Sequence, residues 1–220
     1  MDTDRLRHIA SQLRQPQGEA GIETGQRMNV GNELIYQRAI AQLAIQPGDH
    51  ILELGPGNGF FARQIVATDS SVRYTGCDLS ETMIAEAGRL NEEFVQDGQV
   101  ELVLRDRPAL PFADAAFDKV FTINTLYFWD DPSAELAEIR RVLMPDGLLI
   151  VGIRPRHIME QMPFVTFGFT LYEPNEAADL LTANGFGVTN LIVEPEPDQT
   201  FFGKAIRMET VLVCARPADN

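Results

Sequence analysis

Short apolar runs typical of buried strands alternate along this chain with amphipathic stretches of helical periodicity, and this alternation restricts the fold more than any other feature. The runs that we expect to form strands are Ile51–Leu54, Val72–Cys77, Val100–Leu104, Lys119–Ile123 and Leu148–Ile153. The helices expected around them are Glu33–Leu43, with Asn32 as its N-cap, Phe61–Ala67, Glu81–Phe94 and Ser133–Leu143. Repeated strand–helix–strand units build a parallel sheet with helices on both faces. The sequence therefore predicts an α/β fold.

The C-terminal part departs from this alternation. A helix expected at about Asn175–Ala183 is followed by two β-type runs, Gly187–Val193 and Ala205–Ala215. Only Glu194–Asp198 and a few further residues separate the two runs, which is too short a connection for a parallel pair. We therefore expect the sheet to finish in an antiparallel hairpin.

Charge and cysteine content narrow the partners and the compartment. The chain carries 18 Lys and Arg against 32 Asp and Glu, a formal charge of −14, so we expect neither nucleic acid nor an anionic membrane as a partner. No apolar run approaches the roughly 20 residues that span a bilayer, and the charged N-terminus does not resemble a secretory signal. Cys77 and Cys214 lie far apart, which favours free thiols in the cytoplasm over a disulfide. His8, His50 and His157 lack the spacing of metal ligands, so no metal site is expected.

A glycine-rich turn between the first strand and the next helix is the strongest local signal of a ligand site. Gly55, Gly57 and Gly59 alternate directly after Leu54, where glycine lets ligand atoms approach the backbone and the helix offers unpaired N–H groups. The turn could also be a plain strand-to-helix connection. Because Gly57–Ala62 fits the pattern G-x-G-x-x-A, a dinucleotide site also stays open.

Asp78 follows the second strand, about 20 residues beyond the glycines, where a carboxylate can accept both hydroxyls of a ribose. It could also be an acid that stabilises the start of the following helix. The segment Arg105–Arg107, followed by Leu110–Asp114 and Phe117–Phe121, then decides between ligand classes. A dinucleotide-dependent dehydrogenase has no use for this block.

Together these motifs resemble the class I S-adenosylmethionine-dependent methyltransferases, in particular the small-molecule branch that includes quinone-biosynthesis methyltransferases. The resemblance covers residues 28–153 and implies a Rossmann-like, doubly wound, seven-stranded sheet, mostly parallel with an antiparallel final strand. It also implies S-adenosylmethionine as cofactor and needs no catalytic metal. The residues that it assigns to the cofactor are Glu53, Gly55, Gly57 and Gly59 for the methionine moiety, Asp78 for the ribose, Leu79, Asp106 and Arg107 for the adenine, and Asn124 beside the sulfonium.

The sequence indicates the class of the methyl acceptor less clearly than it indicates the cofactor. Ile123-Asn124-Thr125-Leu126-Tyr127-Phe128-Trp129 lacks the Asn-Pro-Pro-aromatic pattern of enzymes that methylate base amino groups, which favours a small-molecule acceptor. Tyr127 and its two aromatic neighbours form either a wall for that acceptor or part of the core. His157 is either a general base or an exposed helix residue. Arg27 either pairs with the methionine carboxylate or lies on the surface.

We therefore expect a cytoplasmic methyltransferase of one domain. Its parts are an N-terminal cap segment (1–31), a cofactor-binding core (32–153), a lid candidate (154–173) that could instead pack against the domain edge, and a C-terminal helix and hairpin (174–220). Two alternatives stay open, a nicotinamide-dependent oxidoreductase and a non-catalytic protein that binds the cofactor for regulation. The acceptor's identity, the methylated atom and the oligomeric state are left open.

Overall fold

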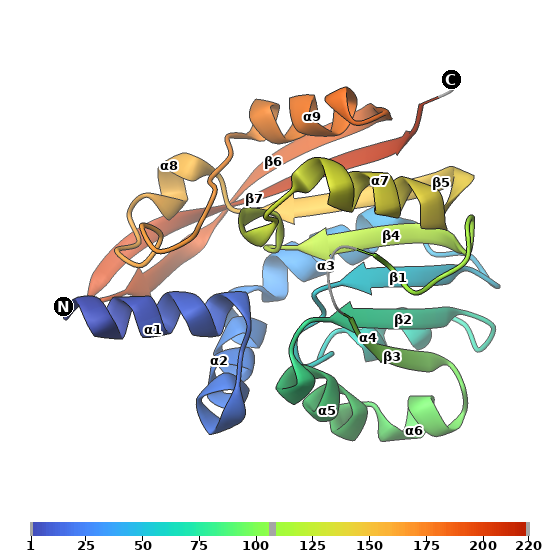
Figure 1. Ribbon diagram of the computed structural model, residues 1–220, viewed down its shortest axis with the longest axis horizontal. Coiled ribbons are helices and arrows are strands. Elements are labelled where there is room, and N and C mark those ends of the chain that lie inside the picture. Colours follow the sequence, from blue (N-terminus) through green and yellow to red (C-terminus); the bar gives the residue numbers. More distant parts are fainter. Residues whose placement is uncertain (1, 106–108, 219–220) are drawn as a thin grey trace.

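The computed structural model describes residues 2–105 and 109–218, and within them one mixed sheet forms the centre of the molecule (Figure 1). The strands, in the spatial order β3-β2-β1-β4-β5-β7-β6, are β1 (His50–Leu54), β2 (Arg73–Asp78), β3 (Val100–Leu104), β4 (Phe117–Ile123), β5 (Leu143–Ile153), β6 (Phe186–Phe201) and β7 (Lys204–Pro217). The first five are parallel, and β7 runs antiparallel to both β5 and β6. The predicted fold class, with its antiparallel final strand, is confirmed.

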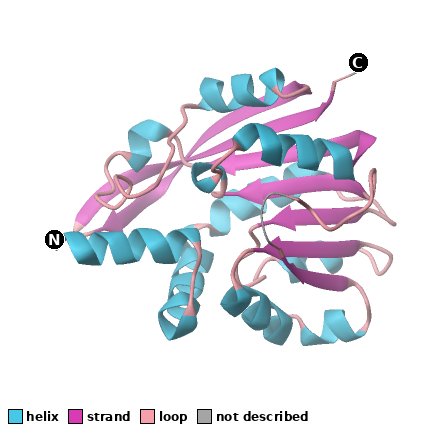
Figure 2. Cartoon of the chain, in the orientation of Figure 1, coloured by secondary structure: helices cyan, strands magenta, loops and turns pink. Residues whose placement is uncertain are grey.

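Helices cover both faces of this sheet (Figure 2). They are α1 (Thr3–Arg14), α2 (Gly18–Gly31), α3 (Glu33–Leu43), α4 (Ala62–Val66), α5 (Glu81–Leu90), α6 (Glu92–Gln96), the 3-10 turn η1 (Leu126–Phe128), α7 (Pro132–Val142), α8 (Arg156–Met159) and α9 (Pro174–Ala183). Apolar side chains of α3 and α4 pack on one face, and those of α7 and α9 pack on the other. Among the described residues, no helix is both long and apolar enough to cross a bilayer.

The helix predicted at Glu81–Phe94 is two helices, because Asn91 interrupts it. Asn91 ends α5 and precedes α6 with a φ of −116°, and its Nδ2 donates to the carbonyl of Gly59 at 3.0 Å. The side chain that breaks the helix is therefore the one that binds the glycine turn to α5. The apolar periodicity alone runs through this break unchanged.

The terminal hairpin is longer than predicted. Glu194–Asp198 is not a connection but part of β6, and the chain turns at Phe202 and Gly203. Pairing with β7 shifts register between Pro195 and Asp198. Prolines are tolerated there because β6 is the edge strand of the sheet, where a missing N–H costs no ladder hydrogen bond.

The two segments outside the strand–helix repeat occupy different places. Residues 1–31 contain α1 and α2, which lie beyond the carboxyl ends of β1 and β2 (Figure 1). Residues 154–173 contain only the short α8 and a series of turns. In this second segment Phe169 packs against Phe128 at a ring distance of 4.6 Å, and the Arg7 guanidinium of α1 lies 5.4 Å from the Phe167 ring. Residues 154–173 therefore pack against both η1 and α1.

Candidate functional site

The glycine turn after β1 forms one wall of a cavity at the carboxyl ends of the parallel strands. Gly55 and Gly57 have φ values of +75° and +56°, in the left-handed region that glycine adopts without strain. A Cβ on Gly55 would collide with the methyl group of Thr125, whereas a Cβ on Gly57 would meet no atom within 4 Å. Both glycines line the cavity. The turn thus leaves open space at Gly57, where a ligand can approach the backbone.

Gly59, which the resemblance assigned to the methionine moiety, packs against α5. It is not among the residues lining the cavity, and a Cβ there would come within 2.9 Å of the Ala87 Cβ and 3.0 Å of the Asn91 Nδ2. Its carbonyl accepts the hydrogen bond from Asn91. The third glycine therefore permits close packing of the turn on α5.

Asp78, at the end of β2, joins the glycine turn to the start of α5. Its Oδ2 accepts from the Gly57 N–H at 3.1 Å and its Oδ1 accepts from the Ser80 N–H at 2.8 Å. Burial raises the pKa of Asp78 from its ordinary value, and the backbone donors at Ser80, Gly57 and Leu79 oppose that rise. These three donors leave the carboxylate one of its four acceptor sites. Both Asp78 and Leu79 line the cavity, as predicted for residues that hold a nucleoside.

Glu53 lies beneath the turn and not in the cavity wall. It is 1% exposed, and its two oxygens accept from the hydroxyls of Tyr36 and Tyr74, each at 2.6 Å. Burial raises the pKa of Glu53 to about 7, although the two tyrosine hydrogen bonds act in the opposite direction. Tyr36 itself lines the cavity and stacks on Phe61 at a ring distance of 3.9 Å. Glu53 thus affects the cavity indirectly, by orienting the side chain of Tyr36.

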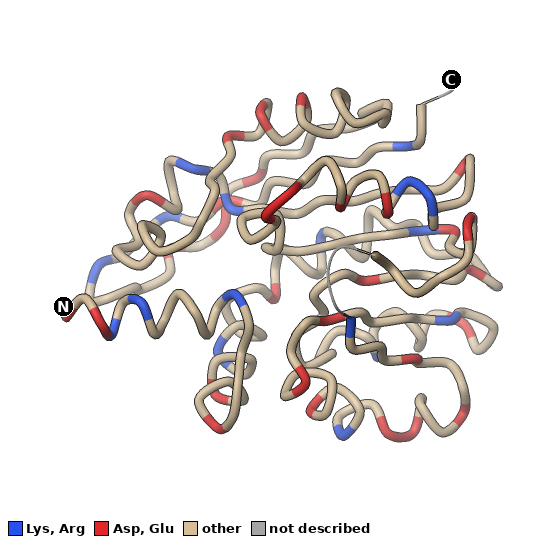
Figure 3. Tube along the Cα trace, in the orientation of Figure 1, with Lys and Arg blue, Asp and Glu red and all other residues tan. Residues whose placement is uncertain are grey.

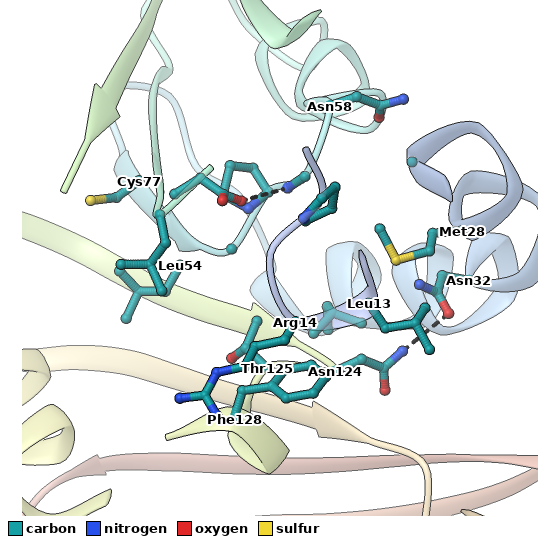
Figure 4. A pocket seen from close by; sticks show the side chains of 18 of the residues that line it. Leu13, Arg14, Met28, Asn32, Leu54, Asn58, Cys77, Asn124, Thr125 and Phe128 are labelled. Atoms are coloured by element: carbon teal, nitrogen blue, oxygen red, sulfur yellow. Dashed lines mark hydrogen bonds between the residues drawn. The ribbon is translucent and has the colours of Figure 1, made fainter. Parts of the chain in front are cut away.

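Asn124 follows β4 with a φ of +58°, an uncommon conformation for a residue other than glycine. Its Nδ2 donates to the Asn32 Oδ1 at 3.0 Å, and its Oδ1 accepts from the Tyr127 hydroxyl at 3.1 Å. Figure 4 shows the two asparagines joined by this hydrogen bond, with Met28 nearby. Asn32 stands at the N-cap position of α3 but makes no side-chain capping bond, because its carboxamide serves Asn124 instead. Both asparagines line the cavity.

The three consecutive aromatic residues divide between the core and the cavity. All three are buried, and Phe128 and Trp129 line the cavity, whereas Tyr127 does not. The Tyr127 hydroxyl lies 3.0 Å from the Arg154 carbonyl as well as beside Asn124, and burial raises its pKa. These contacts fit a positioning role for Tyr127 and leave no free hydroxyl for an acceptor.

His157 and Arg27, the two other expected site residues, lie away from the cavity lining. The His157 ring nitrogens are 3.0 Å from a Glu173 oxygen and 3.2 Å from a Glu209 oxygen. The hydrogen bond to Glu173 raises the pKa of His157, which favours the charged ring and opposes its use as a base. Arg27 is 82% exposed and lies 3.5 Å from Glu23. Of the alternatives for these two residues, the surface positions agree with the structure.

Asp106 and Arg107 lie outside the described residues, so their predicted contacts with adenine stay predictions. Their neighbour Arg105 lines the cavity and is buried, and its Nη2 donates to the Glu135 carboxylate at 2.9 Å. Its Nη1 has no hydrogen-bond partner in the described part of the chain. A buried guanidinium nitrogen without an acceptor is costly, which fits a wall that a polar ligand completes.

The cap segment at the N-terminus forms a further wall of the cavity, with lining residues that the sequence did not predict individually. The connection between α1 and α2 crosses it: Arg14 pairs with Asp130 at 2.6 Å and the Gln15 Nε2 donates to the Leu79 carbonyl at 2.8 Å. Side chains from this cap segment line the cavity together with residues of the core, as Figure 4 shows for Leu13, Arg14 and Met28. One missed residue had a signal. Tyr36 lies on the apolar face of its helix, and a buried tyrosine there needs a partner for its hydroxyl.

Comparisons with known proteins agree with this geometry. Residues 52–151 match the methyltransferase domain family. A demethylmenaquinone methyltransferase of Clavibacter sepedonicus is 30% identical over 193 residues, which cover 84% of this chain and 74% of the relative. The O-methyltransferase resE of Aspergillus sclerotiorum is 38% identical over 125 residues, 57% of this chain and 47% of the relative. The chain thus matches about half the length of that fungal protein.

Among solved structures, an S-adenosylmethionine-dependent methyltransferase from Aquifex aeolicus superposes with a TM-score of 0.67 at 17% identity. The match covers 87% of this chain and 97% of that one. The glycine turn, the acid after β2 and these relatives lead to one conclusion. The chain belongs to the class I S-adenosylmethionine-dependent methyltransferase family.

Proposed function

We propose that this protein binds S-adenosylmethionine in the cavity at the carboxyl ends of β1, β2 and β4 and transfers its methyl group to a small molecule. The observation that carries the proposal is the pairing of Asp78 with the Gly57 N–H at 3.1 Å, next to open space at Gly57. The remaining lone pair on the Asp78 carboxylate suits a ribose hydroxyl. When bound, S-adenosylmethionine supplies a methyl group on a sulfonium, which is electrophilic without a metal.

The residues of the chain bind, orient and shield the reactants. The glycine turn, with its open space at Gly57, receives the methionine end, and Leu79 packs against the adenine, with Arg105 at the same end of the cavity. Asn124 holds its carboxamide in the wall at the end of β4. The cap connection over Leu79 excludes water. Holding donor and acceptor in line can lower the activation free energy of methyl transfer by up to about 7–11 kcal/mol. A general acid or base is therefore not required for every acceptor.

We infer that the acceptor is a small molecule with an apolar part. Leu13, Met28 and Phe128 give the cavity apolar walls, which suit such a molecule. Acidic positions are spread along most elements of the chain (Figure 3), and the formal charge of −14 opposes binding to nucleic acid. The names of the O-methyltransferase and demethylmenaquinone methyltransferase relatives favour a hydroxylated or quinone-type ring as the first class to test.

We further propose a cytoplasmic location. Cys77 and Cys214 are both buried and unbridged, and burial raises the pKa of the Cys77 thiol to about 12. Unreactive free thiols suit a reducing compartment. Cell fractionation that finds the protein in the secreted or membrane fraction would contradict this location.

The cofactor is tested by thermal unfolding with added ligands. S-adenosylmethionine and S-adenosylhomocysteine should both raise the melting temperature, because a ligand at a hundredfold excess over its Kd stabilises the folded state by about 2.7 kcal/mol. NAD and NADP should leave it unchanged. Stabilisation by NAD alone would support the oxidoreductase alternative and overturn the proposal.

Turnover needs a second experiment, because cofactor binding alone also fits a regulatory protein. Methyl-labelled S-adenosylmethionine incubated with hydroxylated aromatic and quinol pools should give labelled product in the organic phase. The matched control is the Asp78→Asn variant, which keeps the shape of the side chain and loses its charge. Cofactor binding without transfer to any pool would favour the non-catalytic alternative.

A further inference from the structure

The carboxamide of Asn124 is fixed by two neighbours in the wall of the cavity. The Tyr127 hydroxyl lies 3.1 Å from its Oδ1, and its Nδ2 donates to Asn32 at 3.0 Å. One contact lies at each end of the carboxamide, so the two neighbours together hold it in place at the cavity wall. Its orientation therefore depends on where η1 and the start of α3 are held.

Arg154, the first residue after β5, holds both of these neighbours. Its backbone N–H donates to the Tyr127 hydroxyl oxygen, and its carbonyl lies 3.0 Å from the same hydroxyl. At the other end of the residue, Nη2 donates to the carbonyl of Gly31 at 3.1 Å. Gly31 directly precedes Asn32. Hydrogen bonds thus link Arg154 through Tyr127 to Asn124. Asn124 in turn is hydrogen-bonded to Asn32, whose peptide neighbour Gly31 is hydrogen-bonded to Arg154.

The guanidinium of Arg154 is itself rigidly held. Arg154 is 3% exposed, and its Nη1 donates to the Glu196 carboxylate and, at 2.9 Å, to the Glu209 carbonyl. Glu196 also accepts from the buried Thr210 hydroxyl. A buried guanidinium that moved would lose these charge-assisted hydrogen bonds without water to replace them. The hairpin of β6 and β7 therefore fixes the position of Arg154.

Other contacts already bind the hairpin to α3. Arg38 pairs with Glu194 at 2.8 Å and donates to the Pro195 carbonyl at 3.0 Å. Arg154 is not needed for that attachment, and its distinct feature is that both ends of the residue lead to Asn124. We therefore assign Arg154 a role at the cavity wall, distinct from the role of Arg38 in attaching the hairpin to α3.

We propose that Arg154 is a positioning residue, which fixes Asn124 and the junction of α2 and α3 at the cavity wall and so shapes the amino-acid end of the cofactor site. The assignment of the ligand rests on the proposed function. Arg154 acts through Tyr127 and Gly31, and it touches no reactant itself. Asp78 and the nucleoside end of the cavity lie outside these hydrogen bonds.

The proposal is tested by calorimetric titration with two probes, S-adenosylhomocysteine and methylthioadenosine, which lacks the amino-acid end. Arg154→Lys keeps the charge beside Glu196 but cannot bridge to Gly31, and Tyr127→Phe removes the hydroxyl from the middle of the path. Each variant should bind S-adenosylhomocysteine about fivefold to tenfold more weakly, the loss expected for one hydrogen bond. Binding of methylthioadenosine should stay within about twofold, since the nucleoside contacts are unchanged.

The matched control is Arg156→Lys. Arg156 lies in the same segment and pairs with Glu176 at 2.5 Å and with the Leu171 carbonyl at 3.0 Å, away from the cavity. It should bind both probes like the wild type. The double variant of Arg154 and Tyr127 should bind more weakly than either single variant, because Arg154→Lys opens the path through Gly31 and Tyr127→Phe opens the path through the backbone of Arg154. Wild-type affinity in Arg154→Lys, or equal losses for both probes, would overturn the proposal.

Hydrogen exchange without ligand gives an independent readout. Amides of residues 28–36 should exchange faster in Arg154→Lys than in the wild type and not in Arg156→Lys, because only the first change removes a donor from the Gly31 carbonyl and leaves it with the Gln199 Nε2 alone, at 3.1 Å. Unchanged exchange there would overturn the proposal even if affinity fell. If S-adenosylhomocysteine does not bind the wild type, the proposed function fails, and the exchange result still decides the role of Arg154.

Discussion

At the scale of single residues, the buried acid under the glycine turn should make stability depend on pH. Burial raises the pKa of Glu53 from 4.5 to about 7. Between these values the folded protein holds a proton that the unfolded chain has released. The free energy of unfolding therefore falls as the pH rises through this interval, and the loss is complete above the folded-state pKa.

Glu53→Gln should remove this loss, since the amide stays neutral and can still accept from a tyrosine hydroxyl. From about pH 5 to pH 8 the variant should gain about 2–3 kcal/mol of stability relative to the wild type. Urea unfolding at several pH values across this range measures the difference, with Glu92→Gln on the exposed start of α6 as control. Parallel curves for the wild type and Glu53→Gln would show that Glu53 is ionised in the folded protein at all these pH values.

The glycines of the turn should separate binding from stability. Gly57→Ala places a methyl group in open space beside the cavity. It should lower the free energy of unfolding by only about 1–2 kcal/mol, the cost of a left-handed conformation for alanine, but weaken the binding of S-adenosylhomocysteine more than tenfold. Gly59→Ala adds overlap with Ala87 and Asn91 and should cost about 2–5 kcal/mol. Denaturant unfolding and calorimetry measure both effects. Equal stability of the two variants, or wild-type affinity in Gly57→Ala, would contradict these roles.

At the scale of elements, the sequence predicts what local patterns control and misses what distant contacts decide. The five parallel strands were predicted because buried strands are continuous apolar runs between turn residues. The extension of β6 through Pro195 and Pro197 was missed, since prolines usually mark turns and only the edge position of β6 tolerates them. The positions of the glycine turn and of Asp78 were predictable too, because each directly follows a strand that the local apolar pattern identifies. The resemblance assigned Glu53 to the methionine moiety, and no sequence pattern shows that the Tyr36 and Tyr74 hydroxyls meet its carboxylate.

The cap formed by α1 and α2 should respond to the cofactor more than any other element. The connection between these helices is held over the cavity by the contact of Gln15 with Leu79 and by the Ser80 hydroxyl, which donates to the Pro16 carbonyl. S-adenosylhomocysteine should therefore protect amides in residues 13–32 and 55–62 from hydrogen exchange. Residues 154–173 contact α1 but supply none of the residues that line the cavity, so they should gain less protection. Protection confined to residues 55–62 would show that neither segment closes over the ligand.

At the scale of the whole molecule, the formal charge of −14 should favour the charged cofactor over its product. S-adenosylmethionine carries a net positive charge from its sulfonium, whereas S-adenosylhomocysteine, with the same other groups, carries none. The Debye length falls from about 30 Å at 0.01 M salt to about 8 Å at 0.15 M, so salt screens the attraction of the distant acidic groups. Across this range S-adenosylmethionine should bind about twofold to fivefold more weakly, with S-adenosylhomocysteine nearly unchanged as an internal control. Calorimetry with both ligands at the two salt concentrations measures the effect. An equal salt dependence for both would place the discrimination in short-range contacts of the cavity and not in the acidic surface.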